Sequence, residues 1–553
     1  MKTDIEIIND STMLEIKEVI KKYDVKDDEL IPYGKYIAKV EFPIFERLKD
    51  KKNGKLILVT AITPTPAGEG KSTTTIGLVD SLNKLGANTI GCIREPSLGP
   101  VFGVKGGAAG GGYAQVNPMV DLNLHFTGDL HAITTANNLV SAVIDNHLYH
   151  GNELNIDPNR ITWKRAMDLN DRSLRKVEVG LSSKREVERN DSFNITVASE
   201  IMATLCLSNN YDDLREKLTR TIVAYNTNGE EITIGDLGIV GSLLVLLKEA
   251  LKPNLIQTLE NNLMFAHGGP FANIAHGCNS NLATKLALKL GDYVVTEAGF
   301  GADLGAEKFL DIKCQEAGLE PNLVVVVATI RALKYHGGQA LKDLVNEDVE
   351  ALKIGVKNLE RHLETVSKYN LNSVVALNRF GTDSEAEISF MQEWAKKNNV
   401  KLALSEVFGK GSAGGAELGQ LVLDNISESR YKPLYLKEES LFTKIERIAT
   451  EVYQASSVVY TKEARAELER LETTEHKNSY IVMAKTPNSI TDNPKVIGVP
   501  KEHTLTIREV RLATGSKFVI CLTGNIMTMP GLSKEPMAKK IDMDNNGLVE
   551  GLM

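Results

Sequence analysis

Apolar runs alternate with helical patterns along most of this chain. The runs are almost continuously apolar, which is typical of strands buried on both faces of a sheet, and helical patterns lie between most of them. We therefore expect an α/β fold with a doubly wound, mainly parallel sheet as its core. The predicted strands are residues 56–62, 89–93, 293–296, 323–329, 373–377, 402–406 and 518–523.

Other segments show a different pattern. Residues 13–24 mix apolar and charged side chains at helical spacing and predict an amphipathic helix ahead of the first strand. Residues 193–208 and 237–263 are helix-like, and the polar segment 179–192 predicts a surface loop or hairpin. We interpret this part of the chain as a helical elaboration of the first domain.

Helix-rich charged linkers near residues 365 and 455 predict the domain boundaries. The chain then divides into a large first domain over residues 1–365 and two smaller α/β domains over residues 366–455 and 456–553. A length of 553 residues is compatible with this division, because it allows roughly two to four domains of ordinary size.

Composition and charge limit the classes of function that this protein can have. Hydrophobic residues make up 42% and charged residues 25%, as in ordinary globular enzymes. The formal net charge of −8 argues against a nucleic-acid binder and an anionic-membrane binder, but it allows a local basic pocket for phosphate. The N-terminus does not resemble a signal peptide, and no apolar run approaches the ~20 residues that span a bilayer. We therefore expect a cytoplasmic protein with neither a membrane nor a nucleic-acid partner.

The cysteine and histidine patterns do not predict a metal centre. Five cysteines are scattered without a C-x-x-C pair, so we expect buried, reduced thiols. Histidines occur in two glycine-containing strings, residues 124–131 and 267–280, but their spacing does not match a zinc site. We expect these histidines to serve as helix caps, in turn hydrogen bonds or in substrate contacts.

The strongest chemical signal directly follows the predicted strand at residues 56–62. Residues 63–73 read Thr-Pro-Thr-Pro-Ala-Gly-Glu-Gly-Lys-Ser-Thr and precede a helical pattern, so strand, glycine loop and helix start follow one another. Gly68 and Gly70 allow a tight turn, Lys71 supplies a positive charge, and Ser72 offers a hydroxyl group to a magnesium ion. The loop therefore predicts a nucleoside triphosphate site of the P-loop type. Its residues are Thr65, Pro66, Ala67, Gly68, Glu69, Gly70, Lys71 and Ser72.

The loop is a variant of the usual P-loop pattern. The strict pattern G-x-x-x-x-G-K-[ST] requires glycine at position 65, where this chain has Thr65. A chance Gly-Lys-Ser turn is the alternative interpretation. The strand and helix patterns on either side favour the nucleotide site.

Arg94 follows the predicted strand at residues 89–93, and a glycine-rich segment at residues 103–112 comes soon after it. Ligands of open α/β folds bind at the carboxyl edge of the sheet. An arginine at that edge can hold a phosphate or a carboxylate with two parallel hydrogen bonds. We predict that Arg94 binds an anionic ligand; a structural ion pair with Glu95 or another acid is the alternative.

Two candidate residues follow the predicted strand at residues 293–296. Glu297 stands where the end of a second strand would present an acid to the nucleotide site. Phe300 lies in a glycine-flanked loop. It would be exposed there to a ligand or a partner, or would pack in the core if the loop folds inward.

Phe380 and Phe408 each come just after a strand-like run, and we expect both of them on loops that contain glycine. Two aromatic side chains at strand ends could hold a flat ring between them. The sequence therefore predicts an aromatic slot, with ordinary core packing as the alternative.

Several long strings resemble the formate–tetrahydrofolate ligase family, also called formyltetrahydrofolate synthetases. They are residues 64–73, 106–115, 124–129, 195–202, 267–280, 300–309 and 523–532, and the resemblance runs from about residue 35 to the C-terminus. The chain departs from the family pattern in the 179–192 loop, at Val120, where an acid is common, and at Phe408, where some members have tryptophan. These departures concern local contacts and not the reaction.

The resemblance implies an ATP-dependent ligase of one-carbon metabolism, which makes 10-formyltetrahydrofolate, ADP and phosphate from formate, ATP and tetrahydrofolate. Formate would first attack the γ-phosphate of ATP to give formyl phosphate, and the N10 amine of tetrahydrofolate would then attack the formyl carbon. The implied site residues are Lys71 and Arg94 for catalysis, Ser72 for ATP-bound magnesium, and Phe300, Phe380 and Phe408 for folate. The family likeness also implies a homotetramer and stimulation by a monovalent cation such as K⁺ or NH₄⁺.

Two other classes of protein stay open at this point. The region around Lys71 also resembles the P-loop of partitioning and metal-insertase ATPases, so a nucleotide switch that binds a protein partner is the main alternative. Such a switch would need neither the aromatic pair nor the glycine-rich segment at residues 103–112, and its release of ADP would not require formate and tetrahydrofolate. A non-catalytic scaffold is the weaker alternative, because the glycine-rich polar loops are numerous.

Overall fold

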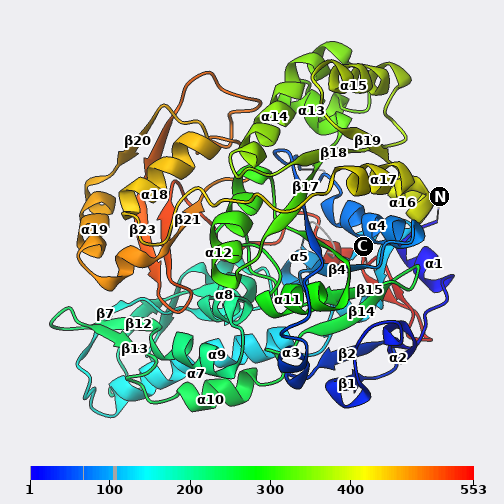
Figure 1. The fold of residues 1–553 in the computed structure, drawn as a ribbon. Helices are drawn as coiled ribbons and strands as arrows, with labels where there is room; N and C mark the ends of the chain where they lie inside the picture. Colours follow the sequence, from blue (N-terminus) through cyan, green and yellow to red (C-terminus); the bar gives the residue numbers. More distant parts are fainter. Residues whose placement is uncertain (1, 67, 104–108, 553) are drawn as a thin grey trace.

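A large mixed sheet runs through the centre of the computed structural model, which describes residues 2–66, 68–103 and 109–552 (Figure 1). Seven neighbouring strands of this sheet are parallel to one another. In spatial order they are β15 (Leu263–Ala266), β4 (Thr89–Ile93), β16 (Tyr293–Glu297), β3 (Lys55–Ala61), β17 (Pro321–Ala328), β18 (Ser373–Asn378) and β19 (Leu402–Ser405). The six strands predicted between residues 56 and 406 are the last six of this series, so the predicted parallel core is confirmed.

Antiparallel strands extend the sheet beyond β15. They are β14 (Asn254–Thr258), β2 (Ile37–Val40), β1 (Leu30–Tyr33), β6 (Ala114–Asn117) and β5 (Gly110–Gly111). The structure therefore corrects the predicted helix over residues 237–263, which is helical only in α10 (Val240–Leu247). Helix α10 ends at Leu247, Pro253 cannot continue a helix, and Asn261 adopts the left-handed turn conformation. The apolar residues on either side of Asn261 therefore form the β14–β15 hairpin.

Helices cover both faces of the parallel region because successive strand residues point to opposite faces. Ile57 and Val59 of β3 lie in one buried cluster with α4 and α17, while Leu56 and Leu58 lie in another with the remaining helices. The first face carries α4 (Lys71–Lys84) and α17 (Ala416–Asn425). The second carries α11 (Asn281–Leu290), α13 (Ile330–His336), α14 (Val349–Ser367) and α15 (Glu385–Lys397).

A second core lies beside the sheet, at the bottom of Figure 1. Its elements are α7 (Asp129–Tyr149), β7 (Ile156–Ile161), α8 (Glu200–Leu207), α9 (Tyr211–Thr219), β12 (Ile222–Asn226), β13 (Glu231–Thr233) and α10. The predicted helix at residues 193–208 is only partly correct, because Phe193–Ile195 forms β11 and Ser199 caps α8. The polar segment 179–192 closes a hairpin between β9 (Val177–Val179) and β10 (Arg189–Asp191), as predicted.

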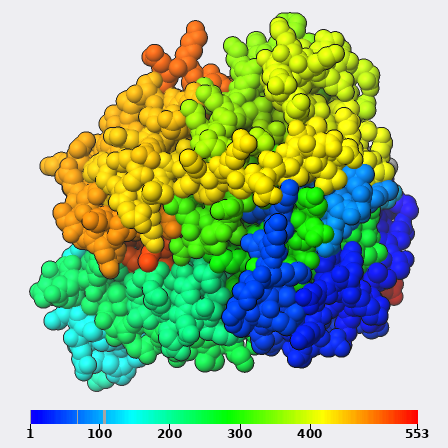
Figure 2. Space-filling model, in the orientation of Figure 1, coloured from blue at the N-terminus to red at the C-terminus, as the bar shows by residue number. Residues whose placement is uncertain are grey.

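The C-terminal part forms a third core with two small sheets. The elements are α18 (Leu441–Arg447), β20 (Ser457–Tyr460), α19 (Lys462–Glu472), β21 (Tyr480–Ala484), β22 (Thr504–Ile507), β23 (Glu509–Ala513) and β24 (Phe518–Leu522), the last being a predicted strand. Residues 426–440 connect α17 to α18 and cross the molecular surface as part of a yellow band in Figure 2. The domain boundaries at residues 365 and 455 stay predictions; β18 and β19, which follow the first of them, continue the large sheet.

Short elements complete the fold. The helices are α1 (Asp4–Asn9), α2 (Ile16–Ile20), α3 (Pro43–Arg47), α5 (Leu98–Phe102), α6 (Met119–Asn123), α12 (Gln315–Ala317) and α16 (Val407–Lys410), and the strands are β8 (Arg165–Met167), β25 (Asp542–Met543) and β26 (Val549–Glu550). The helix predicted at residues 13–24 is therefore present but shorter than expected. Among the helices described, none is long and apolar enough to span a bilayer.

All five cysteines are buried and carry free thiols, as predicted. Burial raises the pKa of Cys92 to about 12 and that of Cys278 to about 11. The thiols are thus neutral at physiological pH and pack as small apolar groups.

Candidate active site

The candidate residues gather at the carboxyl edge of the parallel strands. The predicted P-loop, residues 65–72 and called the P-loop below, follows β3; Arg94 follows β4, and Glu297 ends β16. Strand β16 lies between β3 and β4, so these three groups come from three neighbouring strands. Phe380 and Phe408 follow β18 and β19 farther along the same edge. Because parallel strands end at one edge, the topology brings together residues that lie far apart in the sequence.

The backbone of the P-loop makes the tight turn that we expected from its two glycines. Gly68 and Gly70 have φ angles of 76° and 71°, in the left-handed region that favours glycine. A Cβ atom on Gly70 would lie only 2.4 Å from the Asn378 side-chain nitrogen. Glycine is therefore required at position 70 both for its φ angle and for the close approach of Asn378. Ala67, which we also predicted to bind the nucleotide, lies outside the described residues.

Glu69 holds the P-loop in place. Its carboxylate accepts hydrogen bonds from the Thr65 backbone N–H and hydroxyl, at 2.8 and 2.9 Å, and from the Thr329 hydroxyl, at 2.5 Å. Its main-chain oxygen accepts a hydrogen bond from the Asn378 amide at 3.1 Å. Thr65, which replaces the usual glycine, thus secures the loop through its side chain. Helix α4 begins directly afterwards with Lys71, so the N-terminus of the helix points toward the loop.

Ser72 and Glu297 form a pair of oxygen ligands suited to magnesium. The Ser72 hydroxyl donates a hydrogen bond of 2.8 Å to the Glu297 carboxylate, which is buried at the end of β16. The predicted approach of Glu297 to the P-loop is therefore observed. The described residues contain no group of three or more His, Cys, Asp or Glu side chains able to hold a metal ion. A magnesium ion at this pair would need further oxygen ligands, which phosphate groups and water supply.

Arg94 has no acidic partner among the described residues. One terminal nitrogen donates to the Pro270 carbonyl at 3.3 Å, and Nε is buried without a hydrogen-bond partner. The alternative ion pair with Glu95 does not form within the part of the chain that the structure describes. Burial and the nearby Asp129 carboxylate hold the pKa of Glu95 well above its ordinary value, so Glu95 does not compensate the arginine charge. A partly buried guanidinium with no acidic partner among the described residues is suited to an anionic ligand.

Phe300 adopts an unusual backbone conformation at the start of its loop. Its φ angle is 59°, which is costly for a bulky side chain and occurs mainly where the surrounding structure imposes it. The next residues form two π-helical segments, Ala302–Ala306 and Phe309–Cys314, and such segments are frequent at functional sites. The Phe300 side chain is partly buried, so the loop neither exposes it fully nor places it in the core.

Phe380 is held from two sides. Its backbone N–H donates a hydrogen bond of 2.7 Å to the Asp383 carboxylate, and the Arg331 guanidinium lies 3.6 Å from the centre of its ring. The side chain is partly buried. The ring is therefore ordered before any ligand binds, with one face covered by a cation.

Phe408 lies in the short helix α16 and not on the loop that we predicted. Its side chain is 42% exposed, which argues against core packing. The Phe408 carbonyl accepts a hydrogen bond from the Tyr113 N–H at 2.8 Å, and a Cβ atom on Gly111 would lie 3.0 Å from the ring. The glycine-rich segment thus contacts Phe408, although residues 104–108 of that segment lie outside the described residues.

An ion pair connects the two aromatic segments. Arg379, next to Phe380, lies 3.5 Å from the Glu406 carboxylate, which precedes α16. The ion pair links the segments that carry Phe380 and Phe408. The geometry is compatible with the predicted slot.

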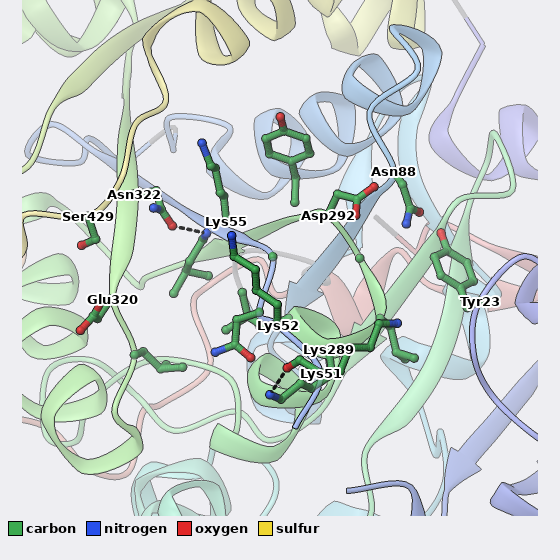
Figure 3. Close-up of a pocket in the computed structure, with 18 of the residues that line it drawn as sticks. Tyr23, Lys51, Lys52, Lys55, Asn88, Lys289, Asp292, Glu320, Asn322 and Ser429 are labelled. Atoms are coloured by element: carbon green, nitrogen blue, oxygen red, sulfur yellow. Dashed lines mark hydrogen bonds between the residues drawn. The ribbon is translucent and has the colours of Figure 1, made fainter. Parts of the chain in front are cut away.

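A cavity of about 690 Å³ lies at the opposite, amino edge of the sheet (Figure 3). Lys52 and Lys55 lie in its middle, between Glu320 and Ser429 on one side and Asn88, Asp292 and Tyr23 on the other. None of the residues predicted to bind ATP or folate lines it. The cavity is therefore separate from the candidate site.

Comparison with known proteins agrees with the resemblance in the motifs. The sequence model of the family described as formate–tetrahydrofolate ligase matches residues 2–553. A curated protein of that name from Thermosipho africanus (strain TCF52B) is 55% identical over 553 residues, which is 100% of both chains. This chain belongs to the formate–tetrahydrofolate ligase family. The match also includes the N-terminal residues, for which the motifs indicated no resemblance.

Several contacts of this formate–tetrahydrofolate ligase fold were not predicted from the sequence. The hydrogen bonds of Glu69 to Thr329 and Asn378 join positions that lie hundreds of residues apart. The stacking of Arg331 on Phe380 was also missed. The only signal in the sequence was the location of the two residues. Thr329 ends one predicted strand and Asn378 directly follows another, so both were expected at the carboxyl edge of the sheet.

Proposed function

We propose that this protein joins formate to tetrahydrofolate in two steps that share one site at the carboxyl edge of the large sheet. ATP is converted to ADP and phosphate, and the product is 10-formyltetrahydrofolate. The observation that carries the proposal is the meeting of three groups at neighbouring strand ends. They are the P-loop, the Ser72–Glu297 pair and the unpaired Arg94.

In the first step, a formate oxygen attacks the γ-phosphorus of ATP and ADP leaves. Phosphoryl transfer depends on positioning and charge neutralisation more than on covalent help from the protein. Lys71 and the N-terminus of α4 neutralise the phosphates, with Ser72 and Glu297 at the magnesium position. Magnesium, when bound with ATP, supplies charge stabilisation on the transferring phosphoryl group.

In the second step, N10 of tetrahydrofolate attacks the formyl carbon of formyl phosphate. The new C–N bond forms, the C–O bond to phosphate breaks, and N10 loses its proton. Arg94 holds the phosphoryl end of the intermediate, because its guanidinium can donate two parallel hydrogen bonds to phosphate oxygens. No covalent intermediate on the protein is required.

The folate ring binds between Phe380 and Phe408, with Phe300 nearby. The exposure of Phe408 and the fixed position of Phe380 support this assignment. A homotetramer and stimulation by K⁺ or NH₄⁺ follow from family likeness, and a cytoplasmic location follows from the sequence; all three stay predictions.

The experiment that tests this proposal follows the oxygen atoms. If formyl phosphate forms, heavy oxygen from labelled formate must appear in the released inorganic phosphate. Mass spectrometry that finds the label only in 10-formyltetrahydrofolate would contradict the intermediate. Arg94→Ala should slow labelled phosphate formation by more than about tenfold while the KM for ATP changes less than about twofold, because Arg94 binds the intermediate and not the nucleotide.

A further inference from the structure

Arg331 occupies a position between the nucleotide loop and the aromatic slot. It is the second residue of α13, whose N-cap is Thr329. The Thr329 hydroxyl accepts a hydrogen bond from the Ala332 N–H and donates one to Glu69 of the P-loop. The first turn of α13 is therefore fixed against the P-loop, and this fixes the backbone from which Arg331 extends.

The Arg331 guanidinium lies over an aromatic ring, and its charge also acts on the nearby Asp383 carboxylate, where it opposes the rise in pKa that burial causes. Its guanidinium carbon lies 3.6 Å from the Phe380 ring centre, which is the spacing of a close stacked contact. Its Nε is buried without a hydrogen-bond partner. No ion pair of Arg331 occurs within residues 2–66, 68–103 and 109–552. The side chain is only partly buried, so the ring contact and the nearby Asp383 carboxylate together compensate the charge of the guanidinium.

The stacked contact restricts the Phe380 ring. The backbone of Phe380 is held by Asp383, and Arg331 covers one ring face. The contact restricts the ring on one side, and because the side chain is only partly buried, the opposite face is the one that a flat ligand would use. A ring that is ordered in advance loses less conformational entropy when it stacks on a ligand.

We propose that Arg331 is a positioning residue for tetrahydrofolate, which acts by holding Phe380 in the orientation that stacks on the folate ring. This inference rests on the proposed folate site at Phe380 and adds to it a residue that does not touch the substrate. Arg331 acts through Phe380 only, so its contribution depends on the presence of that ring.

The test is a double-mutant cycle between Arg331 and Phe380. Arg331→Met keeps the length of the side chain and removes its charge and planarity. We expect it to raise the KM for tetrahydrofolate about fivefold and to change the KM values for ATP and formate by less than about twofold. Arg331→Lys should recover part of the loss, because an ammonium group also binds an aromatic face, but without the planar stack. In a Phe380→Ala background, Arg331→Met should have almost no further effect on the KM for tetrahydrofolate.

Arg361→Met is the matched control. Arg361 is also partly buried, lies on the neighbouring helix α14 and has an ion pair of only 4.0 Å with Glu364. Its replacement should leave the KM for tetrahydrofolate unchanged. Thermal melts of all variants identify any loss through unfolding.

The outcomes separate the inference from the proposed function. An unchanged KM for tetrahydrofolate in Phe380→Ala would overturn the folate site itself, and the inference with it. If Phe380→Ala raises this KM but Arg331→Met does not, only the inference is overturned. An equal effect of Arg331→Met with and without Phe380, or a rise in the KM for ATP, would also overturn it.

Discussion

The two edges of the parallel sheet differ in what their loops offer a ligand. The amino edge has a cavity of about 690 Å³, whose lysines are mixed with acids and amides. The carboxyl edge carries two left-handed glycines, the start of helix α4 and the Arg94 guanidinium, which has no acidic partner in the described part of the chain. The volume of a cavity therefore does not identify the active site. The chemistry of the strand ends does, because helix N-termini and specialised loops occur at the carboxyl edge.

Strand β3 connects the two edges and provides a direct comparison. It begins with Lys55, which lines the cavity, and ends just before the P-loop that contains Lys71. Its length of 7 residues separates the two edges by about 20 Å. Lys55 and Lys71 are close in sequence but thus lie in different chemical environments, so each of them serves as a control for the other.

The largest effect is expected for Lys71→Ala. The variant should lose at least about 99% of the synthesis rate, because it lacks the loop cation that neutralises the phosphates of ATP. Turnover at saturating ATP should be measured together with a thermal melt. We expect the fold to persist, since Lys71 is only partly buried.

Lys55→Ala is the matched control at the other end of β3. It removes the same side chain and should change turnover by less than about twofold, because Lys55 lies far from the phosphates. Retention of more than a tenth of the wild-type rate by Lys71→Ala would contradict its role. A large loss in Lys55→Ala would show that the two edges are coupled.

A moderate effect is expected for the aromatic slot. Phe380→Ala and Phe408→Ala should each raise the KM for tetrahydrofolate about tenfold, equivalent to ~1.4 kcal/mol, with a much smaller change in the KM for ATP. Steady-state kinetics with each substrate varied in turn provide the measurement. Removal of both rings should raise the KM for tetrahydrofolate more than removal of either ring alone.

Tyr293→Ala provides the aromatic control from the amino edge. Tyr293 lines the cavity at the start of β16, so its truncation should lower the melting temperature but leave the KM for tetrahydrofolate unchanged. If Phe380 and Phe408 were core residues, their truncation would cost ~3–5 kcal/mol of stability and affect both substrates equally. Such a result would show that the slot is wrongly assigned.

The smallest effect concerns Asp80, on the helix α4 that runs between the two edges. Burial raises the pKa of Asp80 to about 7, so the folded protein holds a proton there that the unfolded chain releases above about pH 4. Stability should therefore fall as pH rises from about 4 to about 7, and stay at the lower level above that range. Asp80→Asn stays neutral and should reduce the fall in melting temperature between pH 5 and pH 8 by about 2–4 °C.

Asp424→Asn, an exchange of an exposed acid on α17, is the control for charge alone. It should leave the pH dependence of the melting temperature as in the wild type. An identical pH profile for Asp80→Asn and the wild type would mean that Asp80 does not titrate in this range. Neither exchange should alter turnover at pH 8.

The sequence was sufficient for the parts of the fold with a simple periodic signal. Continuous apolar runs such as residues 323–329 predicted buried parallel strands, because few other elements tolerate them. The segment at residues 254–263 was mistaken for part of a helix, since short apolar runs do not distinguish a strand from a buried helix. In this segment Pro253 is incompatible with a continuous helix, and the left-handed turn at Asn261 allows a hairpin.

Residues of the candidate site could likewise be predicted only where the sequence carries a local signal. Arg94 and Glu297 could be placed because each directly follows a strand, and the topology of a parallel sheet brings such residues together. The contact of Arg331 with Phe380 could not be predicted, because it joins the first turn of α13 to the loop after β18, whose relative position depends on tertiary packing. The helical position of Phe408 was missed because α16 has only 4 residues and hence no periodic pattern.

The order of strands in the sheet has a consequence for synthesis of the protein on the ribosome. Strand β3 pairs with β16 and β17, and β4 pairs with β15 and β16, all of which come much later in the chain. After β3 emerges, residues 62–292 must be translated before its first neighbour begins, which takes roughly 12–46 s at about 5–20 residues per second. During this time β3 lacks both neighbours, and β4 lacks both of its neighbours until β15 (Leu263–Ala266) has been made. The nascent chain therefore exposes unpaired strand edges for much of translation, and we expect its yield in cells to depend on chaperones that shield them.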